Sequence, residues 1–152
     1  MSAIHDRLKQ LGIELPAPPK PVAAYIATQR AGNLIFVSGQ LPRQGEKLLH
    51  EGLVGRDVSL EQAVACARLC GINILAQMEA ACGLDAVKQC VKLTGFVACT
   101  PDFASQPQVI NGSSELMVQI LGEAGRHSRS AVGVAALPTR APVEVEAIFA
   151  VS

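Results

Sequence analysis

The sequence predicts an α+β fold in which two helices cover one face of a mixed six-stranded sheet. Two observations lead to this prediction. Short runs of apolar and β-branched residues, typical of strands, occur toward both ends of the chain, and two longer segments with helical spacing lie between them. The expected order is β-β-(β)-α-β-α-β-β, which buries the apolar faces of sheet and helices by packing them in two layers.

The first 20 residues are expected to form an N-terminal extension, followed by a single domain over residues 21–152. Residues 3–12 have the apolar spacing of a short amphipathic helix. Leu15–Pro21 is expected to be an extended connector, because its prolines lack the amide hydrogen that a helix needs.

Two strands are expected next. Val22–Thr28 predicts the first strand, the Gly32-Asn33 pair predicts a turn, and the apolar run Leu34–Ser38 predicts a fully buried second strand. Gly39–Pro42 breaks the regular structure. The glycines and charges of residues 43–58 then indicate a solvated loop that holds the short third strand.

Helix signals are clearest after this loop. Ser59 and Gln62 have the spacing of a capping box, and Gly83 is a plausible C-cap, so a helix is predicted over 59–82. A second helix is predicted to begin near Gln106–Val109 and to run to Leu121, since its apolar residues recur at helical spacing and Gly122 follows. The two helices supply one layer of the fold.

Charged residues stand within apolar strands near the end of the chain. Cys90–Cys99, Ser130–Ala136 and Val143–Val151 are predicted strands. In the last one, Glu144 and Glu146 share a face, because they alternate with the apolar residues Val143, Val145, Ala147, Phe149 and Val151. Burying an unpaired charge is costly, so these carboxylates indicate a ligand, a subunit contact or both.

Composition narrows the kind of partner. The 13 Lys and Arg balance 13 Asp and Glu, and aromatic residues make up 3% of the chain, so nucleic acid is not an expected partner. Hydrophobic residues make up 49% and charged residues 17%, which favours an oligomer. No apolar run approaches the ~20 residues of a membrane span, and a cytoplasmic protein is expected. The five cysteines fit free thiols, and neither a metal nor another cofactor is expected.

Four segments resemble the YjgF/RidA family, also called the UK114 or L-PSP family. They are Ser38-Gly39-Gln40, Asp102-Phe103-Ala104 with Asn111 and Glu115, Arg129-Ser130 with Pro138, and Glu144–Ile148. The resemblance covers roughly residues 20–151. The N-terminal extension, the longer loop over 43–58 and an insertion before Asn111 mark a divergent branch.

The resemblance implies a chorismate-mutase-like fold and a homotrimer whose sheets form a central barrel. It also implies clefts between subunits that hold small carboxylate-bearing metabolites. Well-characterised members of the family hydrolyse reactive enamines and imines, such as 2-aminoacrylate, to 2-keto acids and ammonia. Others are described as ribonucleases or translation inhibitors.

Arg129 and Glu144 are the expected catalytic residues. The planar guanidinium of Arg129 matches a substrate carboxylate, and the alternative is a salt bridge from Arg129 to Glu144 or Glu146. Glu144 is expected to position water or move protons during imine hydrolysis. Glu146 is interpreted as its structural partner.

The remaining candidates would bind substrate. Ser38, Gly39 and Gln40 are expected to form the pocket floor, where glycine allows close approach of the backbone; the alternative is a simple strand-ending turn. The resemblance places Tyr25 along the cleft, and a buried edge residue is the alternative. Asn111 is expected to contact the ligand or to cap its helix, and His127 is interpreted as a surface loop residue.

Three functions compete at this stage. The leading hypothesis is a cofactor-independent deaminase of enamines and imines. The second is non-catalytic binding of a small carboxylate metabolite through Arg129. The third is an endoribonuclease, which the zero net charge and the lack of a basic cluster disfavour.

Overall fold

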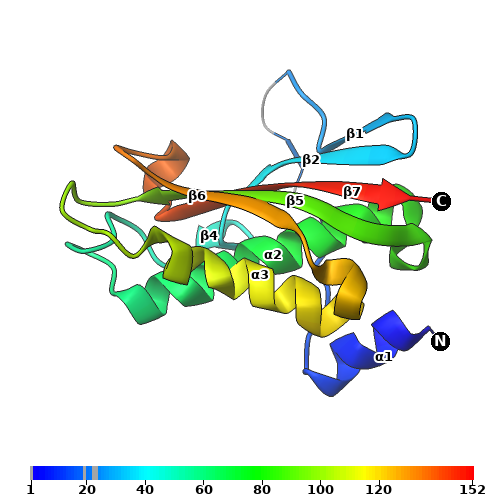
Figure 1. The fold of residues 1–152 in the computed structure, drawn as a ribbon. Helices are drawn as coiled ribbons and strands as arrows, with labels where there is room; N and C mark the ends of the chain where they lie inside the picture. Colours follow the sequence, from blue (N-terminus) through cyan, green and yellow to red (C-terminus); the bar gives the residue numbers. More distant parts are fainter. Residues whose placement is uncertain (1, 19, 22–23) are drawn as a thin grey trace.

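The structure, a computed structural model, describes residues 2–18, 20–21 and 24–152 and is built around a mixed sheet. Five strands follow the order β1-β2-β7-β5-β6, with bounds β1 Thr28–Ala31, β2 Leu34–Gln40, β5 Val87–Ala98, β6 Ser128–Val134 and β7 Val143–Val151. Only the β5–β6 pair among them is parallel. The helices α2 (Leu60–Cys82) and α3 (Gln106–Leu121) cover one face of the sheet (Figure 1). The α+β prediction is confirmed.

The predicted six-stranded sheet is wrong in one respect, because the described residues place five strands in the main sheet. The loop over 43–58 holds a separate two-stranded hairpin, β3 (Arg43–Gln44) and β4 (Lys47–Leu48). In the described residues, 3-10 turns also occur at Leu84–Ala86, Gly122–Gly125 and Pro138–Arg140.

The helix predicted over 59–82 forms within one residue of its expected ends, and the next one starts and ends where it was expected. The N-terminal helix, predicted over 3–12, ends two residues earlier, at Gln10. Ser59 caps α2 through its hydroxyl, which accepts a hydrogen bond from the Gln62 backbone amide at 3.2 Å. In return, the side-chain oxygen of Gln62 accepts a hydrogen bond from the Ser59 backbone amide at 3.0 Å. Gly83 ends α2 with a positive φ of 77°. Such local signals identify helix ends without knowledge of the fold.

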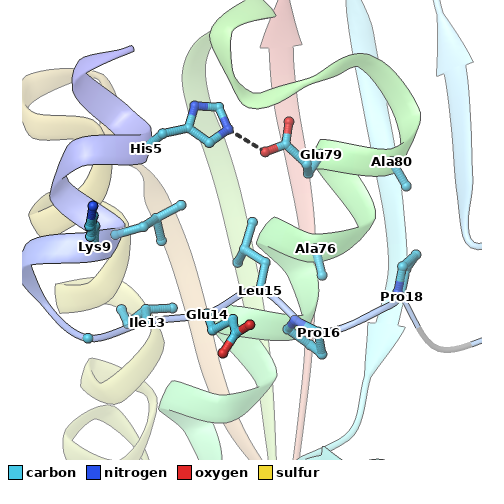
Figure 2. A pocket seen from close by; sticks show the side chains of 12 residues that line it. His5, Lys9, Ile13, Glu14, Leu15, Pro16, Pro18, Ala76, Glu79 and Ala80 are labelled. Atoms are coloured by element: carbon cyan, nitrogen blue, oxygen red, sulfur yellow. Dashed lines mark hydrogen bonds and ion pairs between the residues drawn. The ribbon is translucent and has the colours of Figure 1, made fainter. Parts of the chain in front are cut away.

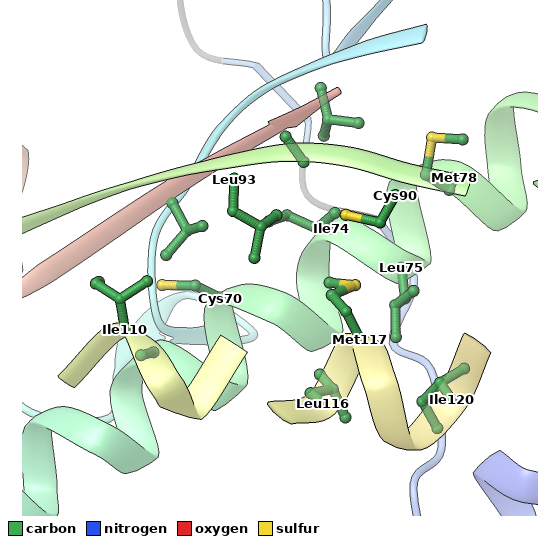
Figure 3. Packing of buried hydrophobic residues seen from close by; sticks show 14 of the residues in the cluster. Cys70, Ile74, Leu75, Met78, Cys90, Leu93, Ile110, Leu116, Met117 and Ile120 are labelled. Atoms are coloured by element: carbon green, nitrogen blue, oxygen red, sulfur yellow. The ribbon is translucent and has the colours of Figure 1, made fainter. Parts of the chain in front are cut away.

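The core lies between the helices and the sheet. Buried residues from α2, α3 and β5 interdigitate there (Figure 3), and β7 adds Val143, Val145, Ala147, Phe149 and Val151, all 3% exposed or less. The two helices approach closely at Gly112. A Cβ on this glycine would stand 3.0 Å from the backbone nitrogen of Arg68.

The predictions for the first two strands need correction. The first strand covers Thr28–Ala31 instead of Val22–Thr28; Val22 and Ala23 lie outside the described residues, and 24–27 are bends and coil. The second strand is not fully buried, because Leu34 is 36% and Phe36 40% exposed. These side chains point to the sheet face that α2 and α3 leave open.

The N-terminal segment packs as a helix, α1 (Ala3–Gln10), against the other two helices. The Arg7 guanidinium donates to the Ile120 carbonyl of α3 at 3.0 Å, and His5 Nε2 lies 2.5 Å from a Glu79 oxygen of α2. The connector after α1 crosses α2 and encloses a largely apolar pocket of about 690 Å³ (Figure 2). The extension is thus anchored on the body of the fold.

The five cysteines are free, and Cys66, Cys70 and Cys90 are buried. Burial raises the pKa of the Cys66 thiol to about 11 and that of Cys90 to about 12. The helices of the described chain are too short or too polar to cross a membrane.

Candidate functional site

The sequence-predicted residues form two separate groups. The first, which we call the Arg129 cluster, contains Arg129, Asn111, Ser114 and His127. Arg129 follows the first residue of β6, and its Nη1 donates to Asn111 Oδ1 at 2.7 Å and to Ser114 Oγ at 3.1 Å. Asn111 and Ser114 lie one turn apart on α3, so the helix presents both oxygens to the half-buried guanidinium.

His127 extends this cluster and is not the surface residue that the sequence indicated. It is half-buried, with Nδ1 2.6 Å from the Gly125 carbonyl and Nε2 2.9 Å from Ser114 Oγ. Nδ1 carries the proton, because a carbonyl can only accept. Asn111 lies within α3, so the helix-capping alternative for Asn111 is wrong.

The alternative of a salt bridge from Arg129 to Glu144 or Glu146 is also wrong. Within the described part of the chain, Arg129 forms no ion pair. Across the sheet, Arg129 is opposite Leu93, and Leu93 is opposite Ala147. Glu144 is therefore two strands and three residues away, roughly 14 Å between backbones. Among the described residues, neutral oxygens hold the guanidinium and no carboxylate neutralises its charge.

The second group lines a cavity of about 610 Å³, which we call the Glu144 pocket. Four sequence-predicted residues line it together: Tyr25, Gly39, Gln40 and Glu144. Side chains that the sequence did not point to complete it, among them Lys20, Arg43 and Gln77. Tyr25 is 49% exposed, so the alternative of a buried edge residue is wrong.

Gly39 and Glu144 are in direct contact across the β2–β7 pair. The register of this pair shifts between Val37 and Gln40, which brings Gly39 against the Glu144 side chain. A Cβ on Gly39 would overlap the carboxylate and stand 2.8 Å from Glu144 Cδ. Burial, and next the nearby Glu146, raise the pKa of the half-buried Glu144 carboxyl. The strand continues through Gln40, so the predicted break after Ser38 is a local irregularity within β2.

Two buried amides form the floor of the Glu144 pocket. Gln40 is 7% and Gln77 4% exposed, and Gln77 Nε2 donates to Gln40 Oε1 at 3.4 Å. Gln40 Nε2 in turn donates to the Ser38 carbonyl at 3.0 Å. Ser38 does not line the pocket, and its hydroxyl donates to the Ile26 carbonyl at 2.8 Å. Ser38 thus positions the strand around Gln40.

Some of the residues in or beside the Glu144 pocket that were not predicted nevertheless had a signal in the sequence. Asn73 and Gln77 are amides spaced four apart in the apolar middle of α2, and a buried amide needs a partner. Asn73 Nδ2 donates to the carbonyls of Leu41 and Arg43 at 3.0 and 3.2 Å, which fixes the chain beside the pocket. Lys20 had no comparable signal. Among the described residues, no three His, Cys, Asp or Glu side chains gather as a metal site.

Comparison with known proteins agrees with this geometry. A family model described as "YjgF/chorismate_mutase-like, putative endoribonuclease" matches residues 5–150. The chain belongs to the YjgF/RidA family. The match begins within the segment predicted to be an extension, so most of α1 falls inside it.

Relatives with similar sequences share most of the chain. Protein TCP17 of Trypanosoma cruzi is 43% identical over 93% of this chain and 89% of its own length. A RutC family protein of Pyrococcus horikoshii is 31% identical over 86% of this chain and 89% of its own.

Solved structures of related proteins match this chain to different degrees. A protein of unknown function from Agrobacterium tumefaciens, 47% identical, covers 99% of this chain and 93% of its own with a TM-score of 0.93. RidA from an Antarctic Psychrobacter, 31% identical, covers 89% of this chain and 94% of its own with a TM-score of 0.64. A Shewanella oneidensis protein is equally identical to this chain, at 31%, yet covers 99% of it and 100% of its own length with a TM-score of 0.95. Identity alone therefore does not set the structural match within this family.

Proposed function

We propose that this protein hydrolyses reactive enamine and imine intermediates, such as 2-aminoacrylate, to 2-keto acids and ammonia. The observation that carries the proposal is how the fold surrounds these two groups. Arg129 is a guanidinium held by neutral oxygens, and Glu144 is a half-buried carboxyl whose pKa is raised. An anion-binding group and a proton-transferring group are what the hydrolysis of a 2-imino acid requires.

The two groups work together in clefts between subunits of a homotrimer. In one chain their backbones are roughly 14 Å apart, and Arg129 reaches toward α3 while Glu144 alternates with the core-facing residues of β7 and so lies on the opposite face of the sheet. The carboxylate and the imine carbon of a 2-imino acid, by contrast, are directly bonded. One small substrate therefore cannot contact both in the same chain. The open sheet face carries exposed apolar side chains of Leu34, Phe36 and Val132, which favours its burial against another subunit.

Each residue has a distinct role in this reaction. Arg129 binds the carboxylate of the substrate and fixes its orientation. Glu144 orients a water molecule, whose oxygen bonds to the imine carbon while a proton passes to nitrogen. The C–N bond of the resulting carbinolamine then breaks, leaving the keto acid and ammonia. A raised pKa suits a carboxyl that must accept and return a proton near neutral pH.

The test is keto-acid release from an imine generated by an L-amino acid oxidase. Wild-type protein is expected to accelerate release, and Arg129→Ala and Glu144→Gln should each lose about 100-fold or more. Arg126→Ala is the matched control, since Arg126 is exposed and pairs with Glu123 at 3.6 Å. Equal rates for wild type, Arg129→Ala and buffer would disprove the proposal.

Mixing the two inactive variants tests the shared cleft. If each site takes Arg129 from one subunit and Glu144 from another, refolding Arg129→Ala together with Glu144→Gln restores part of the activity in mixed trimers. No recovery despite a mixed oligomer, seen by native mass spectrometry, would contradict this arrangement.

The family description supplies a second candidate, RNA cleavage. Nucleotide release from RNA by purified protein, lost in Arg129→Ala and kept in Arg126→Ala, would favour it over imine hydrolysis. Ligand binding without turnover in either assay would instead favour a carboxylate-binding protein.

A further inference from the structure

The Glu144 pocket carries two cationic side chains that hydrolysis of a simple imine does not need. Lys20 comes from the connector after α1, and Arg43 begins the hairpin β3–β4. Neither forms an ion pair with any residue that the structure describes. Two positive charges therefore line the same cavity as Glu144 without a protein carboxylate bound to either.

Arg43 is held in place by neutral groups. Its Nη1 donates to the Glu46 carbonyl at 3.0 Å, and its Nη2 donates to Thr139 Oγ1 at 3.4 Å. Its own carbonyl accepts from the buried Asn73 at 3.2 Å. The guanidinium is thus fixed between the hairpin and the turn before β7, and no carboxylate of the described residues pairs with it. A positioned guanidinium is a strong receptor for a carboxylate.

The acidic residues of the pocket form no ion pair with either cation among the described residues. Glu46 also lines the cavity, but it contacts Arg43 through its backbone carbonyl. Glu144 lies against Gly39 and forms no ion pair among the described residues. The pocket therefore presents separate cationic and acidic groups, which suits a substrate with an acidic group besides its reacting end.

We propose that Lys20 and Arg43 bind a second carboxylate on the substrate, so that the pocket prefers imines of dicarboxylic amino acids over those with neutral side chains. The inference rests on the proposed function, with Arg129 reserved for the carboxylate next to the imine. Lys20 and Arg43 then determine specificity, and the chain segment that follows α1 becomes part of the site.

Binding of the keto-acid products tests this recognition without catalysis. By titration calorimetry, 2-oxoglutarate should bind wild-type protein at least about tenfold more tightly than 2-oxobutanoate. Lys20→Gln and Arg43→Gln should each remove most of that difference and leave 2-oxobutanoate binding nearly unchanged. Lys47→Gln is the matched control, because Lys47 lies on the same hairpin without lining the pocket.

Two results would overturn the inference. One is equal affinity of wild-type protein for the two keto acids. The other is an equal loss in Lys47→Gln and Arg43→Gln, which would reveal a general charge effect. Lys20→Gln keeps the test valid if Arg43→Gln disturbs the hairpin, since Lys20 forms none of the hydrogen bonds that hold it.

Kinetics separate this inference from the proposed function. Imines made from L-glutamate and from L-2-aminobutanoate should show the same preference in kcat/KM, lost in Lys20→Gln. Hydrolysis of both imines at equal rates would sustain the proposed function and refute the inference. Selective binding of 2-oxoglutarate without hydrolysis of either imine would refute the proposed function and sustain the recognition of a second carboxylate.

Discussion

Replacing Gly39 by alanine tests whether the position of Glu144 matters for activity. The backbone of Gly39 is outside the left-handed region, so alanine fits its conformation. The added Cβ, however, would overlap Glu144 Oε2 and stand 2.8 Å from Cδ and 3.1 Å from Cγ. Since the contacted atoms form the end of a flexible side chain, we expect the carboxylate to rotate away while the β2–β7 pair stays intact.

The expected magnitudes differ for stability and activity. Forcing a side chain off its rotamer costs about 0.5–1.5 kcal/mol, and each kcal/mol lowers the Tm of a chain of this size by about 2–4 °C. Relieving the overlap moves the carboxylate by roughly an ångström or more, and such a misplacement of a reacting group costs about 100-fold in rate. Gly39→Ala should therefore fold almost normally and be nearly inactive.

The assay is kcat/KM for imine hydrolysis together with thermal unfolding of the same preparation. Comparing Gly39→Ala alone and in a Glu144→Ala background shows whether the effect passes through the carboxylate. In that background we expect no further loss. Activity of Gly39→Ala within twofold of wild type would refute the reasoning. A Tm drop above about 10 °C would refute it as well, because it would mean that the β2–β7 pairing is disrupted instead of the carboxylate being moved.

Three further substitutions test the fold and the electrostatics. Ser59→Ala should lower the free energy of unfolding by about 1 kcal/mol, whereas Ser105→Ala should change it little, because Ser105 makes no side-chain cap bond; chemical denaturation of both checks this. Gly112→Ala should lower the free energy of unfolding by about 1–3 kcal/mol, because the added Cβ would meet the backbone of α2. The control is Val118→Ala, at a 43% exposed position of the same helix. The raised pKa of Glu144 means that the folded state holds this proton more tightly than the unfolded chain, so its contribution favours folding at low pH and is lost as pH rises. Glu144→Gln should therefore raise Tm at pH 7, and the difference from wild type should vanish below about pH 4.

Elements with local signals could be predicted from the sequence. The ends of α2 follow from Ser59 and Gly83, and β7 matches its predicted range Val143–Val151 because strict alternation identifies both faces of a strand. The first strand could not be placed this way. Its extent is set by pairing with β2, where Thr28 is opposite Val37 and Ala31 is opposite Leu34. The residues of the strand itself do not indicate this pairing.

The residues of the candidate site also divide into those with a local signal in the sequence and those without one. Charges inside apolar strands predicted Arg129 and Glu144 as special, and the resemblance added Tyr25. Lys20 and Arg43 come from a connector and a hairpin, where charged residues are ordinary, so only the folded chain shows that they share a cavity with Glu144. The loop over 43–58 also looked merely solvated, and its hairpin is what brings Arg43 to the pocket.

The position of β7 explains why core and site meet in the last strand. β7 pairs with both β2 and β5 in the middle of the sheet. Every second side chain of β7 therefore faces the helices, and the remaining ones face the open side of the sheet. The Glu144 carboxylate fits beside β2 only because Gly39, at the irregularity in that strand, has no side chain. Arg129 lies beyond β5 on the edge strand β6, beside α3. The fold therefore separates these two charges within one chain, and they form no ion pair with each other.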